Sequence, residues 1–359
     1  MPKVRAVIAV FLAALAVPLG ASVLHVGTRQ GASESATEAD RPTTWTAWLD
    51  YFDAHFGFRR DLIEAHAALM WEVLRESPSG TVIKGRDGWL YYADDSSLDD
   101  YESETPLTDD ELAQWRDAFV SIRDRMRALG AAYVLVIAPD KHVLYPEHMP
   151  ASIHRLHSQY RMDQLLDYLR AHSDLAIADL RGPLVARKPV ERLYHRTDTH
   201  WNDRGAFVGY DTIMRTAGRE IPGLAPMPRA GFLPVTTRRN GMDLAEMLSI
   251  APLVQEDSLD LVPRQPRRAQ LVEPPDLREG YEVARAVTEI PRTQLPRLVM
   301  FRDSFATALI PFLSEHFSRA VYLWQNNVDD SIVVQEKPAL VIHEIVGRRF
   351  QTLVPESVE

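Results

Sequence analysis

Residues 297–305 read Arg-Leu-Val-Met-Phe-Arg-Asp-Ser-Phe, an apolar run that passes directly into a polar turn. The run from Arg297 to Phe301 predicts a buried β-strand, and a helix is predicted from the turn through Phe317. Two more strands are predicted at 320–323 and 339–345, with a helical stretch between them. Repeated alternation of strand and helix indicates an α/β fold in which a parallel sheet is flanked by helices.

The preceding part of the chain continues this alternation. Thr108 and Glu111 form the pattern of a capping box, which predicts a helix that runs to about Leu129. The continuous apolar run 132–138 is typical of a parallel strand covered on both faces. The other predicted elements are a β-hairpin over 82–92 with its turn at Asp87-Gly88, a helix over 160–171, strands over 175–180 and 192–196, and a helix that Asn202 caps and that continues to about Thr216.

The composition restricts the class of protein. The chain has 359 residues, of which 46% are hydrophobic, so it is long enough to bury a full core. A formal net charge of −10 argues against general nucleic-acid binding. The chain has no cysteine, which excludes disulfides, thiolate chemistry and Cys-ligated zinc.

The N-terminal segment predicts export from the cytoplasm. Lys3 and Arg5 precede an uncharged apolar run from Ala6 to Leu24, long enough as a helix to cross about 30 Å of hydrocarbon. We interpret residues 1–30 as a signal anchor whose positive flank stays cytoplasmic. Cleavage near Gly20-Ala21-Ser22 is the alternative, and it would make the segment a signal peptide. In either case the chain after the polar linker 31–44 lies outside the cytoplasm.

Residues 45–359 are expected to form one domain that contains a loop-rich insertion. Eleven of the 24 prolines fall between residues 215 and 296, so this region is interpreted as loops and short strands and not as an independent domain. It also carries a small basic cluster of Arg264, Arg267 and Arg268.

Two short stretches carry the residues of a hydrolytic or acyl-transfer site. Asp198 and His200 are two positions apart, so on an extended chain their side chains point to the same side and the carboxylate can orient the imidazole. Ser304 follows a predicted strand and opens a predicted helix, whose N-terminal amides suit an oxyanion. The alternative is structural, because Ser304 or Asp303 can simply cap the helix.

Two further interpretations concern the surroundings of these residues. Asp140 and Lys141 follow the strand 132–138 at its carboxyl end, where ligands collect in open α/β sheets, so they either line the site or form a solvated turn. His195, Asp198 and His200 offer three ligands to a divalent metal ion. A regular extended chain weakens this metal site, because it places residue 195 on the opposite side from residues 198 and 200.

Four stretches resemble a known family when they are taken together and in order. They are His-Phe-Gly-Phe-Arg at 55–59, Lys-Gly-Arg-Asp-Gly-Trp-Leu-Tyr at 84–91, Asp-Thr-His-Trp-Asn at 198–202 and Arg-Asp-Ser-Phe at 302–305. They resemble the SGNH-hydrolase-like O-acetyltransferases of exopolysaccharide modification, which include the alginate acetylation proteins AlgJ and AlgX. The resemblance extends from about Trp45 to residue 359 and implies an SGNH-hydrolase-like fold.

The resemblance also implies residue roles. Ser304 matches the family's nucleophile, His200 its general base and Asp198 the residue that orients the base. Arg302 is a departure, because several members have glycine there. This arginine is expected either to crowd the nucleophile or to contribute to anion binding.

The resemblance implies acetyl transfer to hydroxyls of an exported, alginate-like polysaccharide in the bacterial periplasm, with the anchor in the inner membrane. A membrane-bound acyltransferase is the implied acetyl donor, and no cofactor or metal is expected. An acetyl esterase or deacetylase with the same residues is the alternative enzyme. A non-catalytic polysaccharide-binding scaffold is the alternative from another class.

Overall fold

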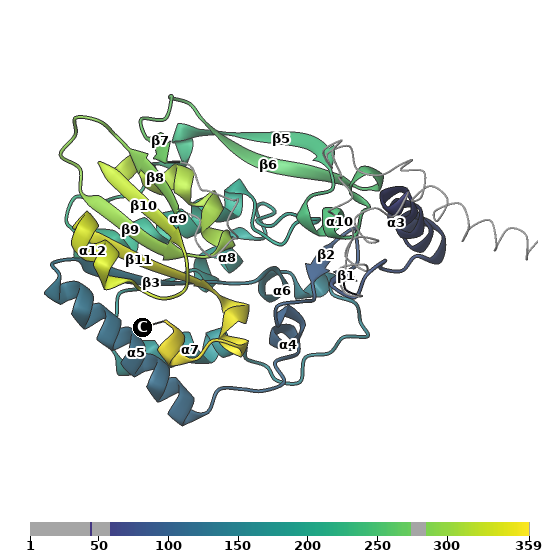
Figure 1. The fold of residues 1–359 in the computed structure, drawn as a ribbon, viewed down its shortest axis with the longest axis horizontal. Coiled ribbons are helices and arrows are strands. Elements are labelled where there is room, and N and C mark those ends of the chain that lie inside the picture. The colour runs from purple at the N-terminus through teal and green to yellow at the C-terminus, as the bar shows by residue number, and fades with distance from the viewer. Residues whose placement is uncertain (1–43, 45–57, 274–284, 359) are drawn as a thin grey trace, which may run out of the picture. The chain divides into compact units, whose positions relative to one another are not determined.

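The structure is a computed structural model that describes residues 44, 58–273 and 285–358 (Figure 1). The predicted anchor, nearly all of the predicted linker and most of the 55–59 stretch lie outside the described residues. In the part of the chain that is described, no helix combines the length and apolar character needed to span a membrane. The chain divides into two compact units, Met1–Pro78 and Ser79–Glu359. The described part of the first unit contains helix α3 (Arg59–Ala68), which continues into the π-helical turn η2 (Leu69–Leu74).

A seven-stranded sheet forms the centre of the second unit, with strand order β4-β3-β11-β9-β10-β8-β7. Its five strands from β4 to β10 are parallel, and β11, the last of them in sequence, lies between β3 and β9. The strands are β3 (Ala132–Ala138), β4 (Ile177–Asp179), β7 (Gln270–Glu273), β8 (Arg285–Glu289), β9 (Arg297–Arg302), β10 (Arg319–Trp324) and β11 (Leu340–Val346).

The expectation of a purely parallel sheet is wrong at one edge. Strand β8 pairs antiparallel with β10, and β7 pairs antiparallel with β8, so the sheet is mixed. The chain connects β8 to β9 through residues 290–296 alone, without a crossover helix. A parallel connection requires a longer crossover, so the short link returns the chain in the opposite direction.

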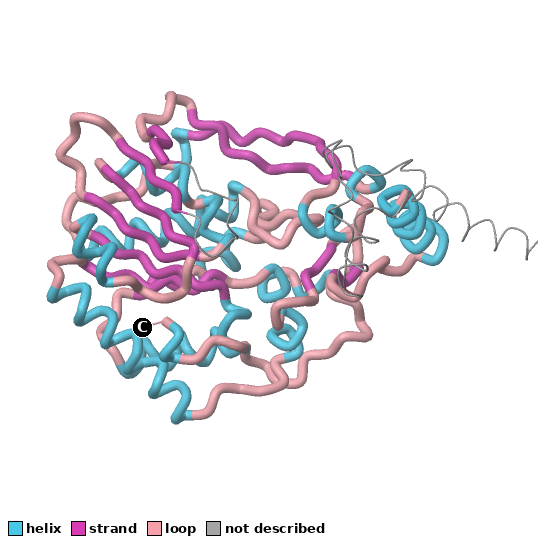
Figure 2. The backbone as a smooth tube through the Cα atoms, in the orientation of Figure 1, coloured by secondary structure: helices cyan, strands magenta, loops and turns pink. Residues whose placement is uncertain are grey.

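Helices cover both faces of the sheet, as the alternating pattern predicts (Figures 1 and 2). Along β3, Val134 and Val136 face one hydrophobic core and Leu135 and Ile137 face the other. The first core is closed by α8 (Arg181–Arg187), α9 (Asp203–Glu220) and α11 (Ile310–Leu313), and the second by α5 (Asp109–Ala128), α7 (Arg161–His172) and α12 (Asp330–Glu336).

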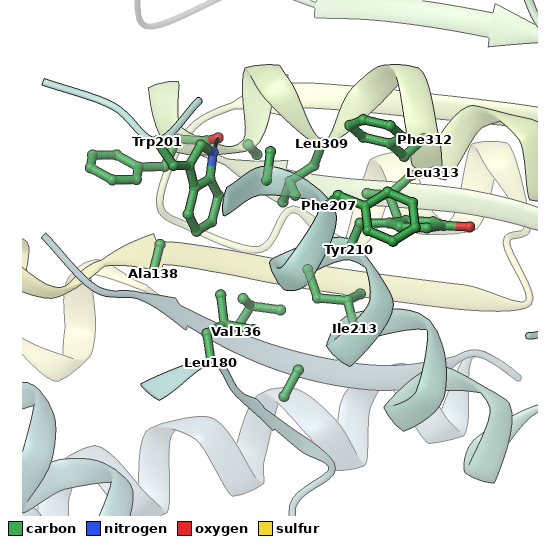
Figure 3. Close-up of a cluster of buried hydrophobic side chains, with 14 of the residues drawn as sticks. Val136, Ala138, Leu180, Trp201, Phe207, Tyr210, Ile213, Leu309, Phe312 and Leu313 are labelled. Carbon is green, nitrogen blue, oxygen red and sulfur yellow. Dashed lines mark hydrogen bonds between the residues drawn. The ribbon is translucent and has the colours of Figure 1, made fainter. Parts of the chain in front are cut away.

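Helix α9 is the main element of the first core (Figure 3). Phe207 and Tyr210 pack against Phe312, with ring centroids 5.6 and 5.5 Å apart. Fully burying an aromatic or aliphatic side chain of this size contributes about 1.5–3 kcal/mol. The buried aromatic face of α9 therefore fixes the helix on the sheet and, with it, the position of the loop that enters the helix.

The helix ends and turns follow from local sequence. The capping box of Thr108 and Glu111 opens α5 as predicted, and the side chain of Asn202 caps α9 by accepting from the amides of residues 204 and 205. The predicted hairpin is also confirmed, as β1 (Val82–Lys84) and β2 (Leu90–Tyr92). Asp87 and Gly88 both adopt positive φ in its turn.

Two predicted elements differ from the structure. Residues 192–196 do not form a strand; Tyr194 makes an isolated bridge to Trp201, so the chain loops back on itself. The predicted helix through Phe317 is broken into a 3-10 turn η8 (Ser304–Ala308), the short helix α11 and a second 3-10 turn η9 (Ser314–His316). Pro311 in the first turn of α11 lacks the N–H that a continuous helix needs, which accounts for the interruption.

The region 215–296 supplies a long two-stranded arm in addition to β7 and β8. Strands β5 (Phe232–Asn240) and β6 (Gln255–Pro263) pair antiparallel along their whole length, separately from the central sheet (Figure 2). The remaining elements of the second unit are α4 (Ser97–Glu102), α6 (Lys141–Leu144), η3 (Pro146–His148), η4 (Arg229–Gly231), α10 (Asp243–Met247), η5 (Ala251–Leu253), η10 (Gly347–Gln351) and η11 (Pro355–Ser357).

The start of α9 tolerates no side chain at Gly205. A Cβ there would lie 2.2 Å from the carbonyl oxygen of Leu193. We therefore expect Gly205→Ala to lower the free energy of unfolding by about 1–3 kcal/mol, measured by chemical denaturation. Gly182→Ala in α8 is the matched control, because its Cβ meets nothing within 4 Å. Equal stability of the two variants would contradict the close packing at residue 205.

Candidate active site

Three predicted residues form one hydrogen-bonded chain. The Nδ1 atom of His200 lies 2.8 Å from Oδ1 of Asp198, and its Nε2 atom lies 2.8 Å from Oγ of Ser304. The backbone N–H of His200 also donates to Asp198 Oδ1, at 2.9 Å. The carboxylate can only accept, so Nδ1 carries the proton and Nε2 accepts from the serine hydroxyl. The structure thus brings together a carboxylate, an imidazole and a hydroxyl in the order that general-base activation of a serine requires.

Ser304 is held at the carboxyl end of β9 by its neighbour Asp303. The Asp303 carboxylate accepts from the amide of Phe305 at 2.9 Å and from the amide of Val346 at 2.7 Å. The amide of Asp303 donates to Glu344 of β11 at 3.0 Å. These bonds cap the 3-10 turn that begins at Ser304 and tie it to the neighbouring strand. The alternative in which Asp303 caps the turn is therefore also correct, and it leaves the serine hydroxyl to His200.

His200 is positioned by the loop that precedes α9. Trp201 next to it is buried, and its indole N–H donates to the carbonyl of Phe305 at 3.0 Å. The imidazole packs against the Phe305 ring, with centroids 5.0 Å apart. The loop that enters α9 and the serine turn are thus joined by hydrogen bonds and by two ring contacts with Phe305, which fixes the distance between base and hydroxyl.

Lys141, predicted to line the site, instead supports the loop from inside. Its ammonium group donates to the carbonyls of His195, Arg196 and Asp198, at 3.3, 3.2 and 2.6 Å. The side chain is buried, and burial lowers its pKa to about 8. An ammonium group has three protons, so all three are used within the protein and direct contact with a substrate is not favoured.

Asp140 and Arg302 are also committed to internal contacts. Asp140 binds the guanidinium of Arg348 at 2.7 Å and accepts from the Arg348 amide at 2.9 Å. Arg302 is only 2% exposed, and its guanidinium stacks over the ring of Trp324, 4.5 Å from the ring centroid. Asp140 and Lys141 were predicted as candidates to line a substrate site and Arg302 to crowd the nucleophile or bind an anion; the structure corrects this, because all three side chains are committed to internal contacts. Arg302 does not crowd the Ser304 hydroxyl, because it donates to Thr307 and to the Asp303 carbonyl.

Removing the Lys141 ammonium should loosen the loop that carries His200. We expect Lys141→Met to lower the free energy of unfolding by about 2 kcal/mol or more, since three buried carbonyls lose a donor. Activity should fall at least about tenfold, because misplacing a base by a fraction of an ångström is costly. Thermal unfolding and an esterase assay would measure both effects. Lys337→Met, at an exposed lysine after α12, is the control, and wild-type activity in Lys141→Met would contradict the role.

Two carboxylates of the 215–296 region hold this loop, and no sequence pattern predicted them. Glu256 of β6 is fully buried and accepts from the amides of Arg196 and Thr197, at 3.0 and 2.9 Å. Asp243 of α10 accepts from the amide of Thr199 at 2.8 Å. An isolated acid in a polar, proline-rich region has no local pattern that distinguishes it from a solvated one, so only the folded arrangement identifies these two.

The electrostatic environment raises the basicity of the oriented imidazole. Burial opposes protonation of His200, but the hydrogen bond and charge of Asp198, together with the charge of Asp243, outweigh it and raise its pKa. Burial likewise opposes ionisation of Asp198, yet its hydrogen bonds and ionic contact with His200 lower its pKa to about 2. Asp198 is therefore ionised throughout the neutral range, and it stabilises the imidazolium that forms when His200 accepts a proton.

The three predicted metal ligands, His195, Asp198 and His200, do not converge on one point in the structure. His195 is buried, and its Nδ1 lies 4.0 Å from Glu256. The potential ligand atoms that converge are those of Asp198, His200 and Asp243, all within 4.8 Å of one another. Asp198 and His200 are already hydrogen-bonded to each other, so within the described residues the geometry favours an oriented imidazole over a metal centre.

The mixed sheet, its two helical layers and the serine turn at the end of β9 define an SGNH-hydrolase-like α/β domain. The family described as "SGNH hydrolase-like domain, acetyltransferase AlgX" matches residues 82–321, more than half of the chain, and the chain belongs to this family.

Curated relatives and solved structures agree with this assignment. The chain is 30% identical over 238 residues to the probable alginate O-acetylase AlgJ of Pseudomonas fluorescens, covering 64% of this chain and 57% of that protein. The chain is 29% identical over 279 residues to the probable alginate O-acetylase AlgJ of Pseudomonas aeruginosa, and the match covers 72% of this chain and 64% of that protein. The chain thus spans between half and two thirds of the length of these relatives. The structure of Bacillus cereus PatB1 with a sulfonyl adduct has the same fold, with a TM-score of 0.56, 17% identity and coverage of 77% of this chain and 100% of that one.

Proposed function

We propose that the protein is an O-acetyltransferase that carries an acetyl group on Ser304 and transfers it to a hydroxyl of an exported, alginate-like polysaccharide. The observation that carries this proposal is the chain of two 2.8 Å hydrogen bonds through His200. Family membership and relatives named as probable alginate O-acetylases support acetyl as the group transferred and a polysaccharide as the acceptor.

The proposed first half-reaction acetylates the enzyme. Nε2 of His200 removes the proton of Ser304 while Oγ attacks the acetyl carbonyl, and the imidazolium then returns that proton to the leaving group of the donor. The Ser304 amide, at the start of η8, is the expected oxyanion donor. Asp198 holds the proton on Nδ1, which leaves Nε2 free to act as the base.

The second half-reaction uses the same atoms in reverse. A polysaccharide hydroxyl attacks the acetyl carbonyl, and its proton passes to Nε2 of His200. The tetrahedral intermediate then collapses, and the proton returns to Oγ of Ser304. Water attacking in place of the sugar would give acetate, so the same residues perform either transfer or hydrolysis according to which nucleophile reaches the ester.

The setting of this reaction is part of the proposal. The apolar run from Ala6 to Leu24, preceded by Lys3 and Arg5, supports an inner-membrane anchor with the catalytic domain in the periplasm. A membrane-bound acyltransferase is the proposed source of acetyl groups, because an acetyl donor made in the cytoplasm must be carried across that membrane.

The test combines a chromogenic acetyl ester with uronic-acid oligosaccharides. Peptide mass spectrometry after a short incubation should find an acetyl group on the peptide that contains Ser304. The oligosaccharide should gain acetyl mass only when enzyme is present. Acetate release without any sugar acetylation would identify an esterase instead. Binding of the oligosaccharide with neither reaction would identify a non-catalytic scaffold.

A further inference from the structure

The proton-bearing nitrogen of His200 faces two carboxylates that come from different parts of the chain. Oδ1 of Asp198 lies 2.8 Å from Nδ1, and Oδ2 of Asp243 lies 3.7 Å from the same atom. Asp198 belongs to the loop of His200, whereas Asp243 is the first residue of α10 in the arm region. At 3.7 Å a charge that is not fully exposed interacts strongly with an imidazolium.

Asp243 is fixed in place by several contacts with the loop. Its Oδ1 accepts from the amide of Thr199 at 2.8 Å and from the amide of Leu244 at 2.5 Å. The backbone around it is bound to the same loop, because the Met242 amide donates to the Thr197 hydroxyl at 3.1 Å and the Leu244 amide donates to the Thr197 carbonyl at 3.1 Å. With Oδ1 occupied in this way, Oδ2 is the oxygen that is directed toward His200.

The other charged groups near His200 do not cancel this contact. Arg348 of η10 opposes protonation of the imidazole, and Asp303 of the serine turn, whose pKa is raised by burial, also interacts with His200. Arg348 is itself bound to Asp140 and Asp95. Two carboxylates therefore lie against Nδ1, and Arg348 is held by other acids. Lys141, whose charge acts on Asp243 and Asp198, is bound to the loop carbonyls.

We propose that Asp243 is a second positioning carboxylate for His200, which anchors the loop through Oδ1 and stabilises the imidazolium through the charge on Oδ2. This inference rests on the proposed function, since the imidazolium forms when Ser304 attacks. It makes helix α10, which lies between strands β5 and β6 in the sequence, part of the active site. Of the two carboxylates, Asp243 is the one that is protonated at the higher pH. Burial, and after it the charge of the neighbouring Asp198, raise its pKa.

A residue that only anchors the loop would behave differently from one that also supplies charge. Asp243→Asn keeps an oxygen that can accept from the Thr199 and Leu244 amides but removes the negative charge. Asp243→Ala removes both. Glu246→Gln is the matched control, because it removes one charge from an exposed position of the same helix.

The first measurement is the pKa of His200, determined by an NMR titration of its imidazole in the folded protein. It needs no substrate, so it remains informative if the proposed acetyl transfer fails. We expect Asp243→Asn to lower this pKa by about half a unit to one unit, and Glu246→Gln to leave it within about 0.2 units of the wild-type value. An unchanged His200 pKa in a folded Asp243→Asn protein would overturn the proposal.

The second measurement is the pH dependence of kcat/KM for a chromogenic acetyl ester. The acidic limb reports the pKa of the free enzyme's base, so it should move to lower pH in Asp243→Asn by the same amount as the NMR value. The plateau should fall by about two- to tenfold, because a less basic imidazole is a weaker proton acceptor. A lower plateau with an unshifted acidic limb would reduce Asp243 to a loop anchor and overturn the electrostatic part.

A third arm of the test addresses metal binding at Asp198, His200 and Asp243. Zinc or magnesium is added to the purified protein, and the histidine NMR signals are followed. We expect no saturable shift of the His200 signal at micromolar metal. A saturable shift that is lost in Asp243→Asn would assign Asp243 to a metal site and overturn the positioning role.

Discussion

Replacing Ser304 with alanine should lower kcat/KM for an acetyl ester by about 10³-fold or more, while the protein stays folded. The hydroxyl that is removed carries the proposed nucleophilic oxygen, which is the hydrogen-bond partner of Nε2 of His200. The His200 side chain is 28% exposed, so water can satisfy its nitrogen after the change. The melting temperature should therefore stay close to the wild-type value, which thermal unfolding would verify.

Ser158→Ala provides the control, because Ser158 is an exposed serine outside the site. It should retain full activity and should not alter acetylation of the Ser304 peptide. If Ser304→Ala kept even a tenth of wild-type activity, a different nucleophile or a water-based mechanism would have to carry the reaction, and the acetyl-serine intermediate would be ruled out.

Replacing Asp198 with asparagine should reduce kcat by about 10²- to 10⁴-fold. The carboxylate holds the proton on Nδ1 of His200 and shares the charge of the imidazolium. An amide in its place presents either a weaker acceptor or a donor, which favours the tautomer with its proton on Nε2. In that tautomer the nitrogen that faces Ser304 cannot act as a base.

The same substitution should change how stability depends on pH. The pKa of Asp198 is lowered to about 2 in the folded protein, below the usual value of about 3.9 for an unfolded chain. A lowered folded-state pKa contributes stability that is present above the unfolded pKa and is lost as the pH falls toward 2. The wild-type protein should therefore lose stability below about pH 4 more steeply than Asp198→Asn, as chemical denaturation at a series of pH values would measure.

The control for the loss of activity is a second Asp–His pair. Asp87 lies 3.0 Å from His148 in the hairpin turn and is mostly exposed. Asp87→Asn should leave kcat unchanged. Loss of activity in Asp87→Asn as large as in Asp198→Asn would show that the effect comes from general loss of acidic charge.

The sequence patterns that predicted correctly were local ones. Strand β3 was predicted with its observed bounds because seven consecutive apolar residues leave few alternatives. The capping box at Thr108 and the cap at Asn202 were also read directly from neighbouring residues. The hydrogen-bonding partners Asp198 and His200 are two positions apart, so their pairing was visible in the sequence, and a serine at the end of a strand was the natural third member.

The patterns that failed depended on contacts between distant segments. Lys141 follows a strand at the edge where ligands bind, and only the fold shows that its ammonium is used by carbonyls some 55 residues away. Asp243 and Glu256 lie in a region with no helical or strand periodicity of its own. The antiparallel edge of the sheet depends on a short connection to β9, which a pattern of alternating strands and helices does not encode.

The position of β11 in the sheet has a consequence for how the protein matures. Strands β3 and β9 carry the supporting and nucleophilic ends of the site, yet they do not pair with each other; both pair with β11, which is made after them. The two halves of the sheet can join only when residues 340–346 have been synthesised. The Ser304 turn, which is tied to Glu344 and Val346, is completed at the same moment. A chain without β11 would thus lack two of the hydrogen bonds that hold the turn at Ser304, so this hydroxyl is positioned for His200 only once β11 is in place.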